Sequence, residues 1–242
     1  MKKLYIKIRG WGLATYYKYL HDKSVKEISK FPEFKEFRKI PRLSRDIIIT
    51  EKIDGTNGCI YIDENNNIFV GSHHRWLWGS VQKEIHNDNH GFAQWVKDHQ
   101  EELLKLGKGY HYGEFMGKGI QRTYGLKENR FYLFNPHRWV KNIGIHDLAM
   151  IQANSNGDFP PLNEKQEYCP DCCYVVPILY KGVFDMEAIT GALLLLQGQG
   201  SYAVPTFMNA EGIVIYHTAG GCYFKKTLKG DDKPKGKNAE DN

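Results

Sequence analysis

The sequence lacks any long run of apolar residues. A membrane-spanning helix needs roughly 18 of them or more, and the longest apolar stretch, residues 192–196, is far shorter and indicates a buried helix. The N-terminal residues 1–7 become charged again before the apolar core of a signal peptide develops. We therefore expect a cytoplasmic protein with no membrane partner.

Cysteine is scarce as well, with five residues in 242. An odd number in a chain of this size argues against a framework of disulfides. Residues 169–173 contain a CxxC spacing, but no second CxxC or close histidine pair follows, as a structural zinc site usually requires. The pattern favours ordinary reduced thiols, with a zinc site as the alternative.

Charge is unevenly distributed along the chain. The formal net charge is +5, yet residues 1–45 hold 13 Lys and Arg against 4 Asp and Glu, whereas residues 46–242 hold 20 against 24. Aromatic residues interleave the basic segment, and Phe31, Phe34 and Phe37 have the spacing of one buried helix face. Such a segment suits RNA, with its phosphates and stackable bases. The alternative is a solvated helix whose aromatic side chains pack inward.

The hydrophobic pattern predicts an α+β domain of antiparallel sheets flanked by helices. Strands are expected over 46–52, 59–62, 68–70, 110–115, 131–134, 175–179, 212–216 and 222–224. Helices are expected over 88–106 and 185–196, and a polar loop over 150–173. We expect one domain over 1–230, with 1–45 as its basic N-terminal segment, and a charged tail over 231–242.

Lys52 directly follows the β-branched run 47–50, so a strand is expected to deliver it into a turn at Asp54-Gly55. A protonated lysine is a poor nucleophile, and it becomes reactive when it is desolvated or placed beside other positive charge. Asn57, just after the turn, can donate a hydrogen bond to a ligand. Because Lys-x-Asp-Gly is also common in surface hairpins, this segment alone leaves a nucleophile and a structural turn both open.

Two downstream segments carry groups that suit phosphates and sugars. Arg75 follows the predicted hairpin and could contact a phosphate with two hydrogen bonds. Glu114 is expected on a strand bracketed by Gly113 and Gly117, where the backbone can approach a ligand closely and the carboxylate could hold ribose hydroxyls. Taken singly, they could also be a solvated arginine and an ordinary glutamate.

Three further positions complete the set. Phe134 offers a ring that could stack on a purine or pack in the core. Glu211 begins a strand with a carboxylate suited to a metal ion or its bound water. Lys225 and Lys226 end the next strand, where one could hold the α-phosphate and the other could help Lys52 lose its proton. Neighbouring strand residues point to opposite faces, so without a bulge only one of the two lysines reaches the nucleotide.

In this order, the segments resemble the nucleotidyltransferase motifs of the covalent ligase and capping-enzyme superfamily, from about Pro41 to Leu228. The resemblance places motif I at 52–57, motif Ia at Arg75, motif III at 113–115, motif IIIa at 131–134, motif IV at 211–214 and motif V at 224–226. The chain is most similar to ATP-dependent RNA ligases of the phage nick-sealing type. Thr50-Glu51 before the lysine and Gly55-Thr56-Asn57 after it carry this narrower resemblance.

The resemblance implies an ATP-grasp-like nucleotidyltransferase fold and an RNA ligase that passes through a covalent lysyl-AMP intermediate on Lys52. It implies ATP as the AMP donor, Mg²⁺ or Mn²⁺, and RNA with 5′-phosphate and 3′-hydroxyl ends, possibly at a nicked duplex. It implies nucleotide contacts from Glu51, Ile53, Asn57, Arg75, Glu114, Phe134, Glu211, Lys225 and Lys226, with Glu211 also near the metal.

The sequence departs from the family pattern in three respects. Motif IIIa ends in Phe134-Asn135 where Phe-Asp is common, the motif V lysines are adjacent rather than separated, and no C-terminal OB-type domain is expected. A DNA ligase or a capping-type guanylyltransferase remains an alternative, although Asn57 disfavours the first and the expected lack of an OB-type domain disfavours both. The other alternative is a non-catalytic RNA-binding module, which would need no lysine nucleophile.

Overall fold

The computed structural model describes residues 18, 20–23, 32–81, 84–88, 90–140 and 167–230. The chain divides into two compact units, Met1–Ile40 and Pro41–Asn242. The charged tail expected over 231–242 and most of the loop expected over 150–173 lie outside the described residues. The single domain expected over 1–230 stays a prediction.

In the first unit, Lys18 and residues 20–23 are helical, whereas residues 32–40 form neither helix nor strand. The prediction of a buried aromatic face is wrong for Phe34 and Phe37, whose exposed fractions are 89% and 82%; Phe31 lies outside the described residues. Prolines at 32 and 41 bracket this short stretch, and a helix of so few residues is not stable without packing partners.

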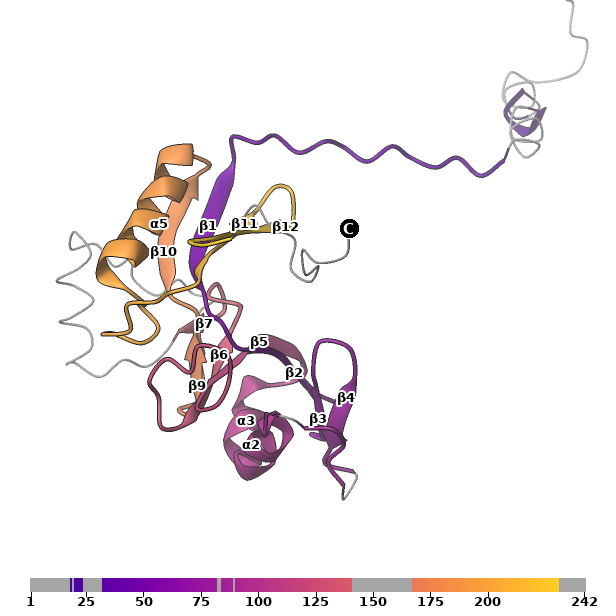
Figure 1. Cartoon of the computed structure of the whole chain (residues 1–242). Coiled ribbons are helices and arrows are strands. Elements are labelled where there is room, and N and C mark those ends of the chain that lie inside the picture. Colours follow the sequence, from indigo (N-terminus) through magenta and orange to yellow (C-terminus); the bar gives the residue numbers. More distant parts are fainter. Residues whose placement is uncertain are drawn as a thin grey trace, which may run out of the picture. The chain divides into compact units, whose positions relative to one another are not determined.

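The larger unit contains a four-stranded antiparallel sheet in the order β10-β1-β11-β12 (Figure 1). Its strands are β1 (Asp46–Lys52), β10 (Ile178–Val183), β11 (Gly212–His217) and β12 (Cys222–Thr227). Helix α5 (Met186–Gln199) packs on one face, where Ile189 and Leu196 meet Ile47, Ile49 and Ile213. The carboxylate of Asp185 caps the helix by accepting the backbone N–H of Glu187.

A six-stranded sheet has the order β4-β3-β2-β5-β6-β9, with only the pair β6–β9 parallel. Its strands are β2 (Thr56–Ile62), β3 (Ile68–Gly71), β4 (Trp76–Gly79), β5 (Gly109–Gly117), β6 (Asn129–Leu133) and β9 (Cys173–Val175). Strands β7 (Trp139–Val140) and β8 (Glu167–Tyr168) form a separate parallel pair. The hairpin predicted between 59–62 and 68–70 is confirmed as β2–β3.

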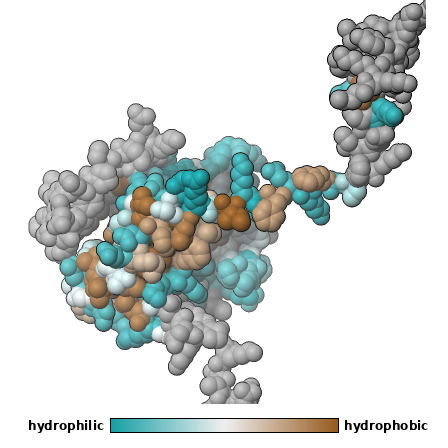
Figure 2. Space-filling model, turned by 90° about the horizontal axis from the view of Figure 1, so that it is seen from above, coloured by the Kyte–Doolittle hydropathy of each residue, from teal (hydrophilic) through white to brown (hydrophobic). Residues whose placement is uncertain are grey.

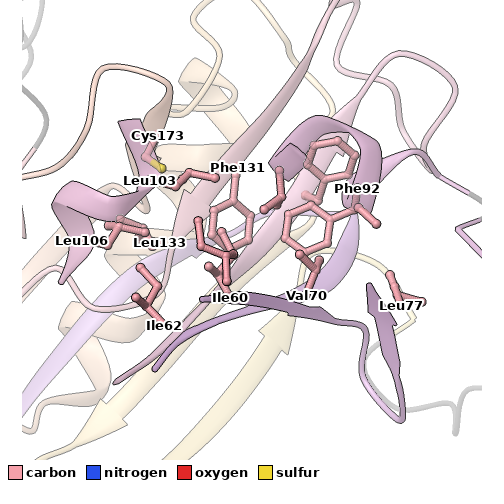
Figure 3. Close-up of a cluster of buried hydrophobic side chains, with 14 of the residues drawn as sticks. Ile60, Ile62, Val70, Leu77, Phe92, Leu103, Leu106, Phe131, Leu133 and Cys173 are labelled. Carbon is pink, nitrogen blue, oxygen red and sulfur yellow. The ribbon is translucent and has the colours of Figure 1, made fainter. Parts of the chain in front are cut away.

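Short helices cover one face of the six-stranded sheet: α2 (Phe92–Asp98), α3 (Gln100–Leu103) and the 3-10 helix η1 (Leu104–Leu106). Figure 3 shows Phe92 and Phe131 side by side in this core, and their ring centroids are 5.0 Å apart. The helix predicted over 88–106 begins only at Phe92 and is divided into these three short helices. Gly91 adopts a left-handed conformation at the start of α2, and the carboxylate of Asp88 accepts the backbone N–H of Gln94.

Within the described parts of the larger unit, the chain crosses between the two sheets at residues 53–55 and at residues 176–177. The prediction of one strand over 175–179 is wrong because Pro177 separates β9 in one sheet from β10 in the other. Proline has no N–H to donate to a ladder, whereas its carbonyl can still accept. The carbonyl of Pro177 accepts the N–H of Glu51 at 3.0 Å, so the crossing at 176–177 lies beside the end of β1, next to Lys52.

The predicted α+β domain of antiparallel sheets flanked by helices is confirmed. On the face seen in Figure 2, hydrophobic residues are interspersed with hydrophilic ones. Among the described residues, no helix is both long and apolar enough to cross a membrane. The cytoplasmic location stays a prediction.

Candidate functional site

Lys52 is the last residue of β1, and its side chain meets the carboxylate of Glu211. The Nζ atom donates to Oε2 of Glu211 at 2.6 Å, and the side chains are 19% and 4% exposed. Glu211 directly precedes β11, whose first residue, Gly212, lies opposite Lys52 in the sheet. A buried carboxylate next to a partly buried ammonium fixes the direction of the lysine, at a point where the two sheets approach each other.

Glu114 brings a second buried carboxylate to this place from the other sheet. Its Oε1 atom accepts the backbone N–H of Gly55 at 3.0 Å, in the turn that follows Lys52. Burial raises the pKa of Glu114 to about 7, against the lowering effects of the Lys52 charge and the Gly55 N–H, and the Glu211 charge raises it further. Lys52, Glu114 and Glu211 thus form one electrostatically coupled group.

The turn after Lys52 is held by residues that sequence reasoning missed. Nε of Arg122 donates to Asp54 at 2.9 Å, and another guanidinium nitrogen of Arg122 donates to the carbonyl of Asn209. The hydroxyl of Tyr124 accepts the backbone N–H of Asp54 at 2.9 Å. These partners come from the irregular stretch after β5, where no periodic pattern exists, so the sequence carries no local signal for them.

Glu51 and Ile53 flank the lysine but lie in the interior. Glu51 is 1% exposed, and its carboxylate accepts the backbone N–H groups of Tyr202 and Ala203 at 2.7 and 2.8 Å. Ile53 is 4% exposed and packs with Met116, Tyr132 and Val204 where the chain passes between the sheets. Both side chains hold the backbone around Lys52, so any contact that Ile53 makes with a nucleotide would come from its main chain.

The register of β12 distinguishes Lys225 from Lys226. Lys225 lies opposite Val214, which lies opposite Thr50, and residues directly opposite each other share a face of the sheet. Since Thr50 and Lys52 are two residues apart on β1, Lys225 is on the Lys52 face. Lys226 lies opposite Ile213, on the face that α5 covers.

Glycine has a specific packing role at two of the motif positions. A Cβ atom on Gly212 would lie 2.2 Å from the carbonyl oxygen of Lys226, so only glycine lets β11 and β12 approach here. A Cβ atom on Gly113 would lie 2.6 Å from the ring of Phe131. The expectation that Gly113 serves close approach to a ligand therefore needs correction, because this glycine makes room for the core on the helix side of the sheet.

Asn57 and Arg75 lie together in the lining of a pocket of about 230 Å³. The other lining residues are Thr56, Ser72, His73, Leu77, Asn87, Asp88, His90 and Phe92. The guanidinium of Arg75 is exposed and donates to the carbonyl of Asn87 at 3.3 Å. Asn57 lies directly opposite Glu114 on β5, which connects this pocket to the carboxylate group.

Phe134 is the residue just after β6 and is 40% exposed. Its backbone N–H donates to the carbonyl of Tyr112 at 2.9 Å, which continues the β5–β6 ladder by one residue. Alternation places Phe134 on the same sheet face as Tyr132 and its opposite neighbour Glu114. The ring is therefore on the face of the site and outside the helix-side core.

The sequence matches the family model described as RNA ligase over residues 45–229. The chain belongs to the RNA ligase family. The match includes all six motif segments and nearly all of the larger unit.

Solved structures of a Naegleria gruberi RNA ligase are also similar to this member of the RNA ligase family. A mutant with AMP and Mn is 20% identical, with a TM-score of 0.43, and the match covers 81% of this chain and 57% of that one. A mutant with ATP and Mn has 20% identity and a TM-score of 0.43, with 82% and 58% covered. The chain thus spans less than two thirds of those proteins. No curated protein sequence matches it.

The raised pKa of Glu114 predicts a pH dependence of stability in this RNA ligase family member. The folded protein keeps the Glu114 proton at pH values where the unfolded carboxyl, with a pKa near 4.5, has lost it. The contribution of this group to stability is therefore lost as the pH rises from about 4.5 through about 7, by up to roughly 3 kcal/mol. Glu114→Gln, which keeps an acceptor for Gly55, removes this titration.

Urea unfolding of wild type and Glu114→Gln at several pH values between about 5 and 8 measures the difference in their free energies of unfolding. The contributions of the other titrating groups are the same in both proteins and cancel in this difference. The variant is expected to gain stability relative to wild type as the pH rises. Glu101→Gln, at an exposed position on α3, is the matched control and should follow wild type. Parallel dependences of stability on pH for wild type and Glu114→Gln would contradict the raised pKa of Glu114 in the folded protein.

Proposed function

We propose that this chain is an ATP-dependent RNA ligase that joins RNA 3′-hydroxyl and 5′-phosphate ends through a lysyl-AMP intermediate. The observation that carries the proposal is Lys52, held at a strand end by Glu211 with Glu114 beside it. Membership of the RNA ligase family supports both the reaction and the nucleic acid. A binding module would have no need of an oriented amine in a group of buried carboxylates.

Three transfers make up the proposed reaction. Lys52 loses a proton, its nitrogen attacks the α-phosphorus of ATP, and the bond to pyrophosphate breaks, leaving AMP on the lysine. An oxygen of the RNA 5′-phosphate then attacks the same phosphorus, which frees Lys52 and leaves AMP on the RNA end. The 3′-hydroxyl attacks the RNA phosphate, loses its proton and displaces AMP. Positioning and neutralisation of phosphate charge dominate catalysis of such transfers.

The proposed roles follow the positions of the side chains. Glu114 would hold the ribose hydroxyls, Phe134 would stack on the adenine, and Lys225 would contact the α-phosphate from the Lys52 face. Asn57 and Arg75 would bind phosphates or the RNA end in their shared pocket. The positive charges of Lys225 and Arg75 would offset the negative charge that the phosphates bring.

The site also fits a divalent cation that arrives with the nucleotide. Glu211 would supply carboxylate oxygens, the ligands that Mg²⁺ and Mn²⁺ prefer. No cluster of three or more metal-ligating side chains occurs in the part of the chain that the structure describes. One or two carboxylates completed by phosphates and water is an ordinary arrangement for Mg²⁺. The ion would neutralise charge on the phosphates.

Labelling with each nucleotide and sealing of each nucleic acid test the proposal. Wild type incubated with α-labelled ATP and Mg²⁺ should retain label after denaturation, and α-labelled GTP should give none. The labelled protein should then seal RNA ends in preference to equivalent DNA ends. Labelling by GTP would indicate a guanylyltransferase, preference for DNA a DNA ligase, and RNA binding without any label a non-catalytic module.

A further inference from the structure

Five aromatic side chains form a continuous row across the six-stranded sheet. They come from four neighbouring strands and are Trp76 on β4, Phe69 on β3, Tyr61 on β2, and Tyr110 and Tyr112 on β5. Successive ring centroids along the row are 6.2, 6.0, 4.4 and 5.9 Å apart. The rings of Tyr110 and Tyr112 are almost parallel, with an interplanar angle of 7°. We call this set the aromatic row.

The aromatic row lies on the sheet face opposite α2 and α3. Along β5, His111 and Phe115 are buried, with Phe115 in the helix-side core, whereas the alternate residues Tyr110 and Tyr112 are 55% and 56% exposed. At the other end of the row Trp76 is 51% exposed. Cross-strand aromatic pairs stabilise a sheet, but that role does not require large rings to keep half of their surface in water.

One end of the aromatic row adjoins the proposed catalytic site. Tyr112 and Glu114 are two residues apart on β5 and so share a face, at a spacing of roughly 7 Å. The carbonyl of Tyr112 accepts the N–H of Phe134, so the two residues are lateral neighbours. At the other end Arg75, which is exposed, directly precedes Trp76. Because Arg75 lines the same pocket as Asn57, this end of the row also adjoins the proposed site, at a cation able to bind a phosphate.

We propose that the aromatic row binds unpaired bases of single-stranded RNA next to the ends that are joined, an inference that rests on the proposed ligase function. The exposed rings of Trp76, Tyr110 and Tyr112 can each accept a base by stacking, without reading its sequence. Tyrosine hydroxyls keep such a surface compatible with water while the ring faces stay available. The preferred substrate is then an RNA end with unpaired nucleotides, since bases in a fully paired duplex are already stacked.

Substitution of the exposed tyrosines tests this surface. The double variant Tyr110→Ala/Tyr112→Ala should bind a fluorescent short oligouridine at least about 10-fold more weakly than wild type, from two lost stacking contacts. Tyr110→Phe/Tyr112→Phe keeps the rings and should bind within about twofold of wild type. Tyr168→Ala, which removes a tyrosine of similar exposure on β8, is the matched control. Binding of an abasic strand of the same length should be equal in all four proteins.

Retained label from α-labelled ATP separates this inference from the proposed function. The double alanine variant should label like wild type, and its sealing of single-stranded RNA ends should fall while sealing of a nicked duplex is kept. If wild type takes no label, the ligase proposal fails. If wild type takes label but the alanine variant binds oligouridine normally, only the aromatic row proposal is overturned. Self-association of wild type that the alanine variant loses, with unchanged oligouridine binding, would assign the row to a second copy of the chain and also overturn it.

Discussion

Replacing Lys52 with alanine is expected to abolish covalent capture of AMP, with a loss of sealing activity of more than roughly 10³-fold, because the nucleophile itself is removed. The measurement is label retained from α-labelled ATP after denaturation, together with sealing of RNA ends. Alanine also leaves the Glu211 carboxylate, which is 4% exposed, without its lysine partner. That change alone can destabilise the protein, so a second variant is needed.

Lys52→Arg provides that control. A guanidinium keeps the positive charge beside Glu211 and should preserve the melting temperature, yet it stays protonated and cannot attack phosphorus. We expect a folded protein that takes no label. Retention of label by Lys52→Arg at the wild-type level would show that another residue carries AMP, and the assignment of Lys52 would be wrong.

The second large effect concerns the two adjacent lysines on β12. Lys225→Ala is expected to slow formation of the AMP adduct by roughly 10²-fold, as loss of one preorganised charge on a reacting phosphate does elsewhere. Lys226→Ala should change it by less than about threefold, since register places that residue on the other face of the sheet. The two variants remove the same charge from neighbouring positions, so each controls for the net charge of the other.

Single-turnover labelling of both variants at saturating ATP measures the difference. Equal losses would mean that the strand bears both lysines on the nucleotide side, as a bulge in β12 would allow. A larger loss in Lys226→Ala would contradict the register argument. Addition of a double variant would show whether the two positions act together.

The strands that carry the site could be predicted because their local patterns are strong. The β-branched run before Lys52 and the hairpin around residues 63–67 each contain a complete signal within a few residues. The same holds for α5, where the Asp185 cap and the apolar face agree. Family motifs then gave the order of the functional groups along the chain.

Features that depend on two distant segments could not be predicted in this way. The choice between Lys225 and Lys226 needs the register of β12 on β11 and of β11 on β1, which no local pattern gives. The contacts of Arg122 with Asp54, and of Glu51 with residues 202–203, each depend on a distant segment that has no periodic pattern of its own. Gly113 has a different role from the expected one, because the ligand face and the core face of β5 alternate at every residue.

Peptide mapping by mass spectrometry of wild type incubated with ATP and Mg²⁺ tests the central claim most directly. The account predicts one adenylyl group on the peptide that contains Lys52, lost in acid as expected for a phosphorus–nitrogen bond, and transferred when RNA with a 5′-phosphate is added. An adenylyl group on any other residue, or an unmodified Lys52 peptide under conditions in which the protein seals RNA, would contradict it.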